Sequence, residues 1–165
     1  MLVTGIYKLL RNYKDVITKV GGKYNDEKSR PIYCCLQDER NKNIFWAIPV
    51  SSMANRSSKQ VERMEMYCNF PKGDIRSCYY HIGLLNNKKA IFKISNALPV
   101  TEKYIAKYVS KGKHLILRDN RVTSELERKL RRVLVEENSK PNKFEQRITD
   151  IYNYLAQEDS KKNRS

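Results

Sequence analysis

The chain has 165 residues and a formal net charge of +15, from 33 lysine and arginine residues against 18 aspartate and glutamate residues. A chain of this length suits one domain that buries about two thirds of its unfolded surface. We expect a polyanionic partner, because neutralising phosphates releases counterions. The first eleven residues lack a secretory signal, and no segment is apolar enough to span a bilayer or carries a lipidation signal. We therefore expect a cytoplasmic protein without membrane attachment.

Cysteine and histidine spacing argues against metal and redox chemistry. The cysteines show no C-x-x-C spacing, and we expect them to be buried, reduced thiols: Cys34, Cys35, Cys68 and Cys78. His81 and His114 are far apart in sequence, and no acidic cluster has ligand spacing. We expect no metal site and no cofactor.

The first third of the chain predicts a helix followed by a hairpin. Apolar residues from Ile6 to Ile17 recur at helical spacing after a possible cap at Thr4. The apolar runs 32–36 and 44–50, separated by a charged break, indicate two paired strands. Residues 51–63 are basic and lack periodicity, and we expect a mobile segment there that holds phosphates.

The remainder predicts three strands and then helices. Residues 64–70 are expected to form a strand before a turn, and 77–85 and 89–94 a hairpin joined at Asn86-Asn87. Three helices are expected after Pro99. The first is capped by Thr101 and carries Tyr104, Ile105, Tyr108 and Val109; the second is opened by a capping box at residues 124–127; the third covers residues 144–155.

This order predicts an α+β fold, because strands and helices do not alternate as parallel βαβ units do. We expect one domain over residues 1–157, with a small, strongly twisted antiparallel sheet, helices packed on it and a helical C-terminal third. Residues 158–165 are expected to form a charged, disordered tail.

The hairpin is expected to bring together the residues that are best suited to catalysis. The two ends of a hairpin lie side by side, so cations at its entry, Lys28 and Arg30, are expected near Ser51 and Ser52 at its exit. A cation and hydroxyl groups supply most of what metal-independent RNA cleavage needs, because the nucleophile is the substrate's own 2′-hydroxyl. The protein then aligns the reacting groups, moves protons and stabilises charge on the phosphate.

These stretches resemble a known toxin family. The run Arg30-Pro31-Ile32-Tyr33 and the strand end Ala47-Ile48-Pro49-Val50-Ser51-Ser52 are similar to the endoribonuclease toxins of type III toxin–antitoxin systems, the ToxN and AbiQ family. Supporting likenesses are found in residues 7–13, 81–86 and 97–100. Among the branches of this family, the chain looks most like the CptN group.

The resemblance implies a MazF/Kid-like, metal-independent endoribonuclease that leaves a 2′,3′-cyclic phosphate and serves in phage defence. It implies an RNA antitoxin, derived from repeats and folded as a pseudoknot, which the toxin processes and with which it forms a closed toxin–RNA hetero-oligomer. Substrates would be cellular or phage RNA. Ser52 matches the family's motif serine, and Ser51 matches the hydroxyl before it.

The basic position at the start of the first strand departs from the family pattern. Arg30 stands near the family's catalytic lysine, and Lys28 is a rival for that role. An arginine does not readily release a proton at neutral pH, so Arg30 would act as an electrostatic stabiliser. Proton transfer would then fall to Tyr7 or His81, and Arg56 loosely replaces a lysine that follows the serines in ToxN.

Further basic and aromatic residues are expected to bind RNA: Arg56, Lys59, Lys8, Arg11, Arg128, Lys129, Arg131, Arg132 and Tyr24. Tyr67, Tyr79 and Tyr80 are additional candidates for stacking on bases, or they only pack in the sheet. Two alternative functions remain open. One is a noncatalytic RNA-binding module, and the other is a DNA-binding regulator that uses the basic helix from Ser124.

Overall fold

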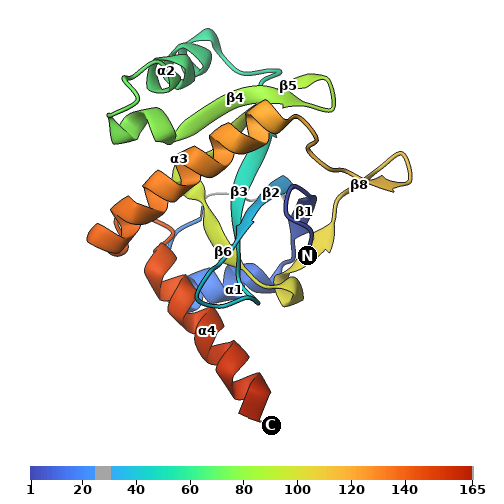
Figure 1. The fold of residues 1–165 in the computed structure, drawn as a ribbon, viewed down its shortest axis with the longest axis vertical. Helices are drawn as coiled ribbons and strands as arrows, with labels where there is room; N and C mark the ends of the chain where they lie inside the picture. Colours follow the sequence, from blue (N-terminus) through green and yellow to red (C-terminus); the bar gives the residue numbers. More distant parts are fainter. Residues whose placement is uncertain (25–30, 165) are drawn as a thin grey trace.

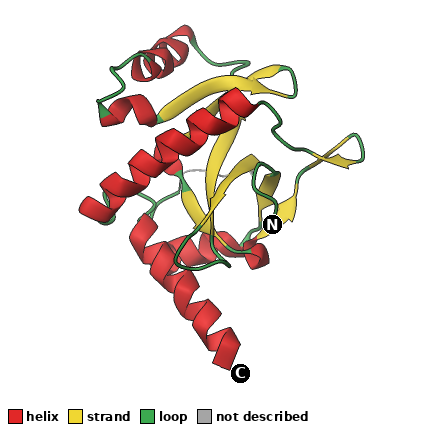
Figure 2. Ribbon diagram, viewed as in Figure 1, coloured by secondary structure: helices red, strands yellow, loops and turns green. Residues whose placement is uncertain are grey.

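The computed structural model describes residues 1–24 and 31–164 and has an α+β architecture, as predicted (Figures 1 and 2). Its seven-stranded sheet has the order β4-β5-β3-β2-β1-β7, with β6 paired to β3 outside this path. All of these pairings are antiparallel. The sheet strands are β1 (Ile6–Leu9), β2 (Pro31–Gln37), β3 (Phe45–Ser52), β4 (Tyr80–Leu85), β5 (Lys88–Lys93), β6 (Leu98–Val100) and β7 (Ile105–Lys107).

Four α-helices occur in the described residues: α1 (Asn12–Lys19), α2 (Ser58–Cys68), α3 (Asn120–Ser139) and α4 (Ile148–Arg164). A small ribbon consists of β8 (Val109–Ser110) and β9 (Lys113–His114), and 3₁₀ turns cover Ile75–Cys78, Ile94–Asn96 and Glu102–Tyr104. None of the helices in the described ranges is long and apolar enough to span a bilayer.

The predicted hairpin is confirmed, and its second strand organises the sheet. Ile32 pairs with Pro49 and Tyr33 with Ile48, with a bulge in β2 between Cys34 and Leu36. β3 pairs with β2 and β6 through its first part, and its last residues pair with β5. This strand therefore connects the β1-β2 side of the sheet to the β4–β5 hairpin.

Helices cover both faces of the sheet. On one face, Leu126 and Leu130 of α3 pack in a core with Val50 and Phe92. On the other, α1 and α4 pack on the β1-β2-β3 side, where Ile151 belongs to the second core. Cys34 and Cys35 are buried in different cores, so their side chains point to opposite faces as predicted. All four cysteines are free thiols.

Near the N-terminus the predicted helix is wrong for its first half. Residues 6–9 form β1, which lies between β2 and β7 in the sheet. Thr4 has a positive φ of 76° and is not a helix cap, and the helix begins at Asn12. Periodicity misled here because the hydrogen-bond partners of β1 are distant in sequence.

The segment after β3 is also different from the prediction. Residues 58–68 form α2, where we expected a mobile segment and then a strand at 64–70. Ser57 caps this helix: its side chain accepts from the Gln60 backbone N–H, while the Gln60 side chain accepts from the Ser57 N–H. The S-x-x-Q spacing was the sequence signal for this start.

The β4–β5 hairpin is confirmed, with Asn86 and Asn87 in the left-handed region at φ values of 53° and 62°. The helix expected from Thr101 is wrong. A 3₁₀ turn there leads into β7, and β8 pairs with β9 across the turn at Lys111 and Gly112. β7 pairs with β1 from the other end of the chain, whereas β8 and β9 form a local hairpin.

The two C-terminal helices are confirmed with different limits. α3 begins at Asn120 and is capped by Asp119, five residues before the cap expected at Ser124. α4 begins at Ile148 and continues to Arg164, so residues 158–164 are helical where we expected disorder. The division of the chain into one domain and a tail stays a prediction.

Candidate active site and nucleic-acid surface

The predicted serine pair lies at the end of β3, where the strand reaches the edge of its pairing with β5. Ser51 pairs with Ile91 and Ser52 with Ala90. Successive side chains of a strand point to opposite faces, so the two hydroxyls do not face the same side of the sheet. Ser51 is half-buried and Ser52 is exposed.

Arg56 holds this strand end in place. After β3 the chain turns through Asn55, which has a φ of 63°, and the Ala54 N–H donates to Ser52 Oγ at 3.0 Å. The Arg56 guanidinium then donates from Nε to the Ser52 carbonyl at 3.1 Å and from Nη2 to Ser51 Oγ at 2.5 Å. A cation thus contacts both serines at the surface, and it is Arg56, not one of the two cations predicted for this position.

This arrangement can stabilise negative charge without a metal. Arginine stays protonated at any physiological pH and presents several N–H donors in a plane, which suits a phosphate that gains charge. Within residues 1–24 and 31–164, no group of three or more His, Cys, Asp or Glu side chains is arranged to hold a metal ion. Lys59, exposed in the first turn of α2, lies in the same segment of chain.

Two predicted site residues, Lys28 and Arg30, lie outside the described residues, so their placement beside the serines stays a prediction. The first described residue after them is Pro31, which begins β2 and pairs with Lys8 of β1. The next residue, Ile32, pairs with Pro49, two residues before Ser51.

Tyr7, a predicted proton-transfer group, is part of the core. It is 4% exposed, and its hydroxyl accepts a hydrogen bond from the Leu2 N–H at 2.7 Å. Its ring meets the His114 ring edge-on, with centroids 4.9 Å apart, and His114 Nε2 lies 2.8 Å from the Ile6 carbonyl oxygen. Burial raises the pKa of Tyr7, so the phenol keeps its proton more firmly and is a weaker acid. The structure gives it no contact with either serine.

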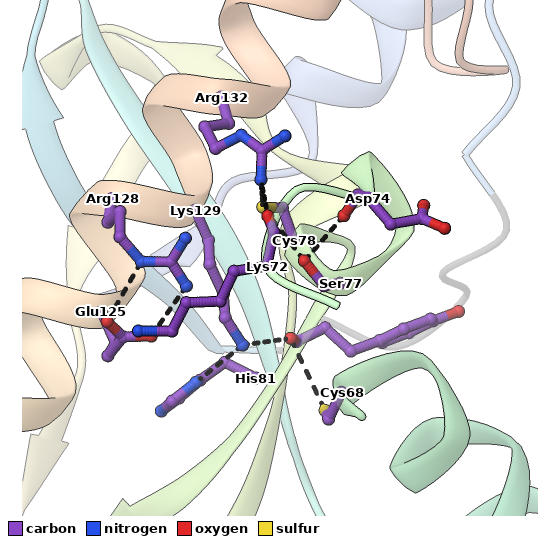
Figure 3. Close-up of polar contacts among 11 residues, drawn as sticks. Cys68, Lys72, Asp74, Ser77, Cys78, His81, Glu125, Arg128, Lys129 and Arg132 are labelled. Carbon is purple, nitrogen blue, oxygen red and sulfur yellow. Dashed lines mark hydrogen bonds and ion pairs between the residues drawn. The ribbon is translucent and has the colours of Figure 1, made fainter. Parts of the chain in front are cut away.

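His81, the other predicted proton-transfer group, faces α3. Its Nδ1 lies 3.1 Å from the Lys129 ammonium, which also donates to the Tyr80 carbonyl at 2.9 Å (Figure 3). Burial and the charge of Lys129 lower the pKa of His81 to about 4. His81 is therefore neutral at pH 7, and an ammonium donor leaves its Nδ1 as an acceptor.

His81 is also separated from the serines. It pairs with Phe92 of β5, which pairs in turn with Val50 of β3, so two strand spacings of about 10 Å in total lie between β4 and β3. By the alternation of side chains, His81 shares its face with Ser52 and not with Ser51. Neither serine contacts it.

Lys129, one of the predicted RNA-binding residues, is not at the surface. It is only 6% exposed, and burial lowers its pKa. The three other predicted basic residues of α3 are exposed or half-buried but engaged. Arg128 pairs with Glu125 at 2.9 Å, Arg131 with Glu127 at 2.8 Å, and Arg132 donates to the Lys72 and Gly73 carbonyls.

The remaining predicted RNA-binding residues are scattered. Lys8 is exposed, with its ammonium 5.1 Å from the centre of the Tyr108 ring. Arg11 is exposed at the start of α1, and Tyr24 packs against the core shared by α1 and α4. None of these contacts tests their predicted role.

Two cavities lie beside α4. One of about 640 Å³ lies beside α4 and includes Phe45 and Glu158, and another of about 500 Å³ includes Asp38 and Tyr152. Neither includes Ser51, Ser52 or Arg56. The serine site is therefore separate from both cavities.

Similarity to known proteins was found among solved structures. No protein-family model and no curated protein matches the chain. A similar solved chain comes from a structure described as "A processed non-coding RNA regulates a bacterial antiviral system". The match has 9% identity and a TM-score of 0.40, and covers 93% of this chain and 86% of that chain. At this similarity the match carries no argument about the function of this chain.

Proposed function

We propose that this protein is a metal-independent endoribonuclease, the toxin of a type III toxin–antitoxin system. It cleaves RNA by attack of the 2′-hydroxyl on the adjacent phosphate, which leaves a 2′,3′-cyclic phosphate. The observation that carries the proposal is the contact of Arg56 with both Ser51 and Ser52 at the surface end of β3. The net charge of +15 supports an RNA partner.

In this mechanism the Arg56 guanidinium stabilises the charge that builds on the phosphate oxygens. Ser51 Oγ accepts a hydrogen bond from Arg56 and donates a hydrogen bond to the phosphate, since a hydroxyl can do both at once. Preorganised donors of this kind are effective because they need no rearrangement during the reaction. Ser52 lies one residue away and contributes the carbonyl that orients Arg56.

Proton transfer needs a different group from those first expected. His81 is neutral and its Nδ1 is engaged by Lys129, and Tyr7 is buried. Lys28 is the better proposal, because a lysine releases a proton far more readily than an arginine. Arg30 then serves as a second electrostatic stabiliser.

The proposal extends to the inhibitor. A small repeat-derived pseudoknot RNA, which the toxin processes itself, holds it in an inactive toxin–RNA assembly in the cytoplasm. Substrates are cellular or phage RNA. Copurification of the protein with a discrete small RNA, encoded by tandem repeats upstream of its gene, tests this part.

Incubation of purified protein with RNA in EDTA tests the nuclease. We expect cleavage by the wild type and strong loss in Ser51→Ala, with Ser139→Ala on the exposed end of α3 as a matched control. Ser52→Ala should lose less, because it keeps the carbonyl that orients Arg56 and removes only the hydroxyl that accepts from the Ala54 N–H. Replacing the scissile nucleotide by its 2′-deoxy form must block cleavage, and the products must carry a cyclic phosphate. Cleavage that depends on added metal, or that survives both serine substitutions, contradicts the proposal.

A noncatalytic RNA-binding module is the second candidate function, favoured by the same basic surface. Its signature is unchanged RNA binding by the wild type and both serine variants, with no cuts under any condition. Preference for duplex DNA over RNA in competition would instead indicate a DNA-binding protein.

A further inference from the structure

A connected set of aromatic rings lies where α2 packs beside the start of β4; Figure 1 shows these two elements side by side. Tyr67 of α2 is its centre, with ring centroids 5.3 Å from Tyr80, 6.3 Å from Tyr79 and 5.7 Å from Phe70. Tyr79 contacts Phe144 at 5.7 Å. All five rings are half-buried, so each leaves part of its surface to solvent. We call this set the aromatic strip.

Cations lie over the rings of the strip. The guanidinium of Arg63 is 6.0 Å from the centre of Tyr67, and that of Arg76 is 3.9 Å from Phe70. Lys143 lies 5.9 Å from Tyr79 and 5.8 Å from Phe144. Arg76 is paired with Asp74, and Lys143 with Glu136. Within the described part of the chain Arg63 makes no ion pair, and its charge is available to a ligand.

Tyr80 of the strip lies on the same face of the sheet as Ser51. Ser51 pairs with Ile91, and Ile91 pairs with Ile82, so these side chains share one face of the sheet. Tyr80 lies two residues from Ile82 and has the same orientation, and two strand spacings of about 10 Å in total lie between β3 and β4. Burial raises the pKa of Tyr80, while the charges of Arg63 and Arg56 act in the opposite direction.

We propose that the aromatic strip and Arg63 bind a single-stranded RNA segment that runs from the phosphate at Ser51 and Arg56 along the α2 side of the hairpin. Unpaired bases stack on exposed ring faces, and the backbone follows the cations, as in other single-strand sites. A duplex keeps its bases stacked on each other and cannot use the rings. The strip therefore selects single-stranded RNA. The direction from the scissile phosphate rests on the proposed nuclease function, while RNA binding by the strip does not.

Binding of a 2′-O-methyl RNA oligonucleotide tests the strip without any cleavage, because the nucleophile is blocked. We expect Arg63→Gln to weaken binding about 3-fold to 10-fold, with a lower salt dependence. Tyr67→Leu should weaken it about 5-fold or more. Lys161→Gln, on the exposed end of α4, is the matched charge control and should bind like the wild type.

Tyr67→Leu can disturb the packing of α2, so the ligand is varied as well. An oligonucleotide with abasic sites should bind the wild type several-fold more weakly, and the duplex of the same sequence should bind more weakly than the single strand. A 2-aminopurine base should lose fluorescence on binding, and Arg63→Gln must keep the wild-type melting temperature.

The proposal is overturned if Arg63→Gln and the abasic oligonucleotide both bind like their parents, or if the duplex binds as well as the single strand. Loss of binding in Arg63→Gln by a protein that never cuts RNA retains the strip and rejects the nuclease. Cleavage of natural RNA with no effect of Arg63 or abasic sites retains the nuclease and rejects the strip.

Discussion

The two faces of the β4–β5 hairpin place cations in opposite environments. On the α2 side, Arg56 and Arg63 lie beside Ser51 and a set of half-exposed rings. On the α3 side, Lys129 is 6% exposed and donates into protein acceptors. Both faces contain the residue types expected of an RNA site, but Lys129 is buried whereas Arg63 is exposed. Residue type alone therefore did not distinguish exposed cations from buried ones.

The α3 side has a structural explanation. β4 is the edge strand of the sheet, and its Tyr80 carbonyl accepts from the Lys129 ammonium and, at 3.6 Å, from the Cys68 thiol (Figure 3). An inward-pointing lysine is a known way to block an edge from pairing with another chain. Lys129 thus fixes α3 to the sheet edge, and the Cys68 thiol fixes α2 to the same carbonyl.

The largest effect should come from Arg56→Ala on the α2 side. Removing a preorganised donor to a developing anion lowers the turnover rate by about 100-fold to 1,000-fold. Single-turnover cleavage in EDTA measures this, and Arg121→Ala, an exposed arginine of α3, is the control. Cleavage by Arg56→Ala at the wild-type rate would show that the active site is not on the α2 side of the hairpin.

Lys129→Ala should affect stability and not chemistry. It leaves His81 Nδ1 without its donor, leaves the Tyr80 carbonyl with the Cys68 thiol alone, and empties a buried space, so we expect a loss of about 2–4 kcal/mol in unfolding free energy. Denaturant titration measures the loss, and Lys129→Met, which keeps the apolar stem, should lose less. A large drop in cleavage per folded molecule would place Lys129 in the active site.

His81 should make stability depend on acid pH. Its folded pKa, lowered to about 4 by burial and by Lys129, is below the usual value of 6.5, so the unfolded chain binds an extra proton between these values. Stability falls as pH drops from about 6.5 to about 4, by about 2 kcal/mol after allowance for partial exposure.

His81→Gln separates this contribution from the carboxylates that titrate in the same range. The difference in unfolding free energy between wild type and variant should shrink or reverse as pH falls, since the variant has no imidazole to protonate. A difference that stays constant from pH 7 to pH 4 would show that His81 does not have the lowered pKa. The pH profile of cleavage should show no inflection from His81 near pH 6.5.

The smallest effect should come from Arg131→Gln on the outer face of α3. Its pairs with Glu127 at 2.8 Å and Glu39 at 3.6 Å are exposed, and such pairs contribute less than about 1 kcal/mol. We expect a stability change below about 0.5 kcal/mol and an RNA affinity within about 2-fold of the wild type. A strong loss of RNA binding would show that α3 is a main contact for RNA, as the sequence predicted.

Elements held by local contacts were predictable from sequence. The β2–β3 and β4–β5 hairpins combine apolar strands with turn residues, and Asn86-Asn87 adopts the positive φ angles that such a turn needs. Elements whose partners are distant were not. Residues 6–9 and 105–107 have helical spacing, yet they pair with each other in the sheet as β1 and β7.

The candidate site divides in the same way. Pro49 to Ser52 and the basic segment after them pointed to the end of β3, where Arg56 contacts both serines, and the S-x-x-Q spacing at Ser57 was a local signal for α2 that we missed. Tyr7 and His81 as proton carriers depended on contacts between separate strands and helices, and the structure places neither against a serine.

The sequence by itself determined the positive charge, the two hairpins and the position of both serines at a strand end, since these follow from composition and from neighbours along the chain. Only the tertiary structure decided which cations reach solvent and which phenol or imidazole can change protonation. Solvation and pKa depend on what packs around a group, and here α2 and α3 cover opposite sides of one hairpin from distant parts of the chain.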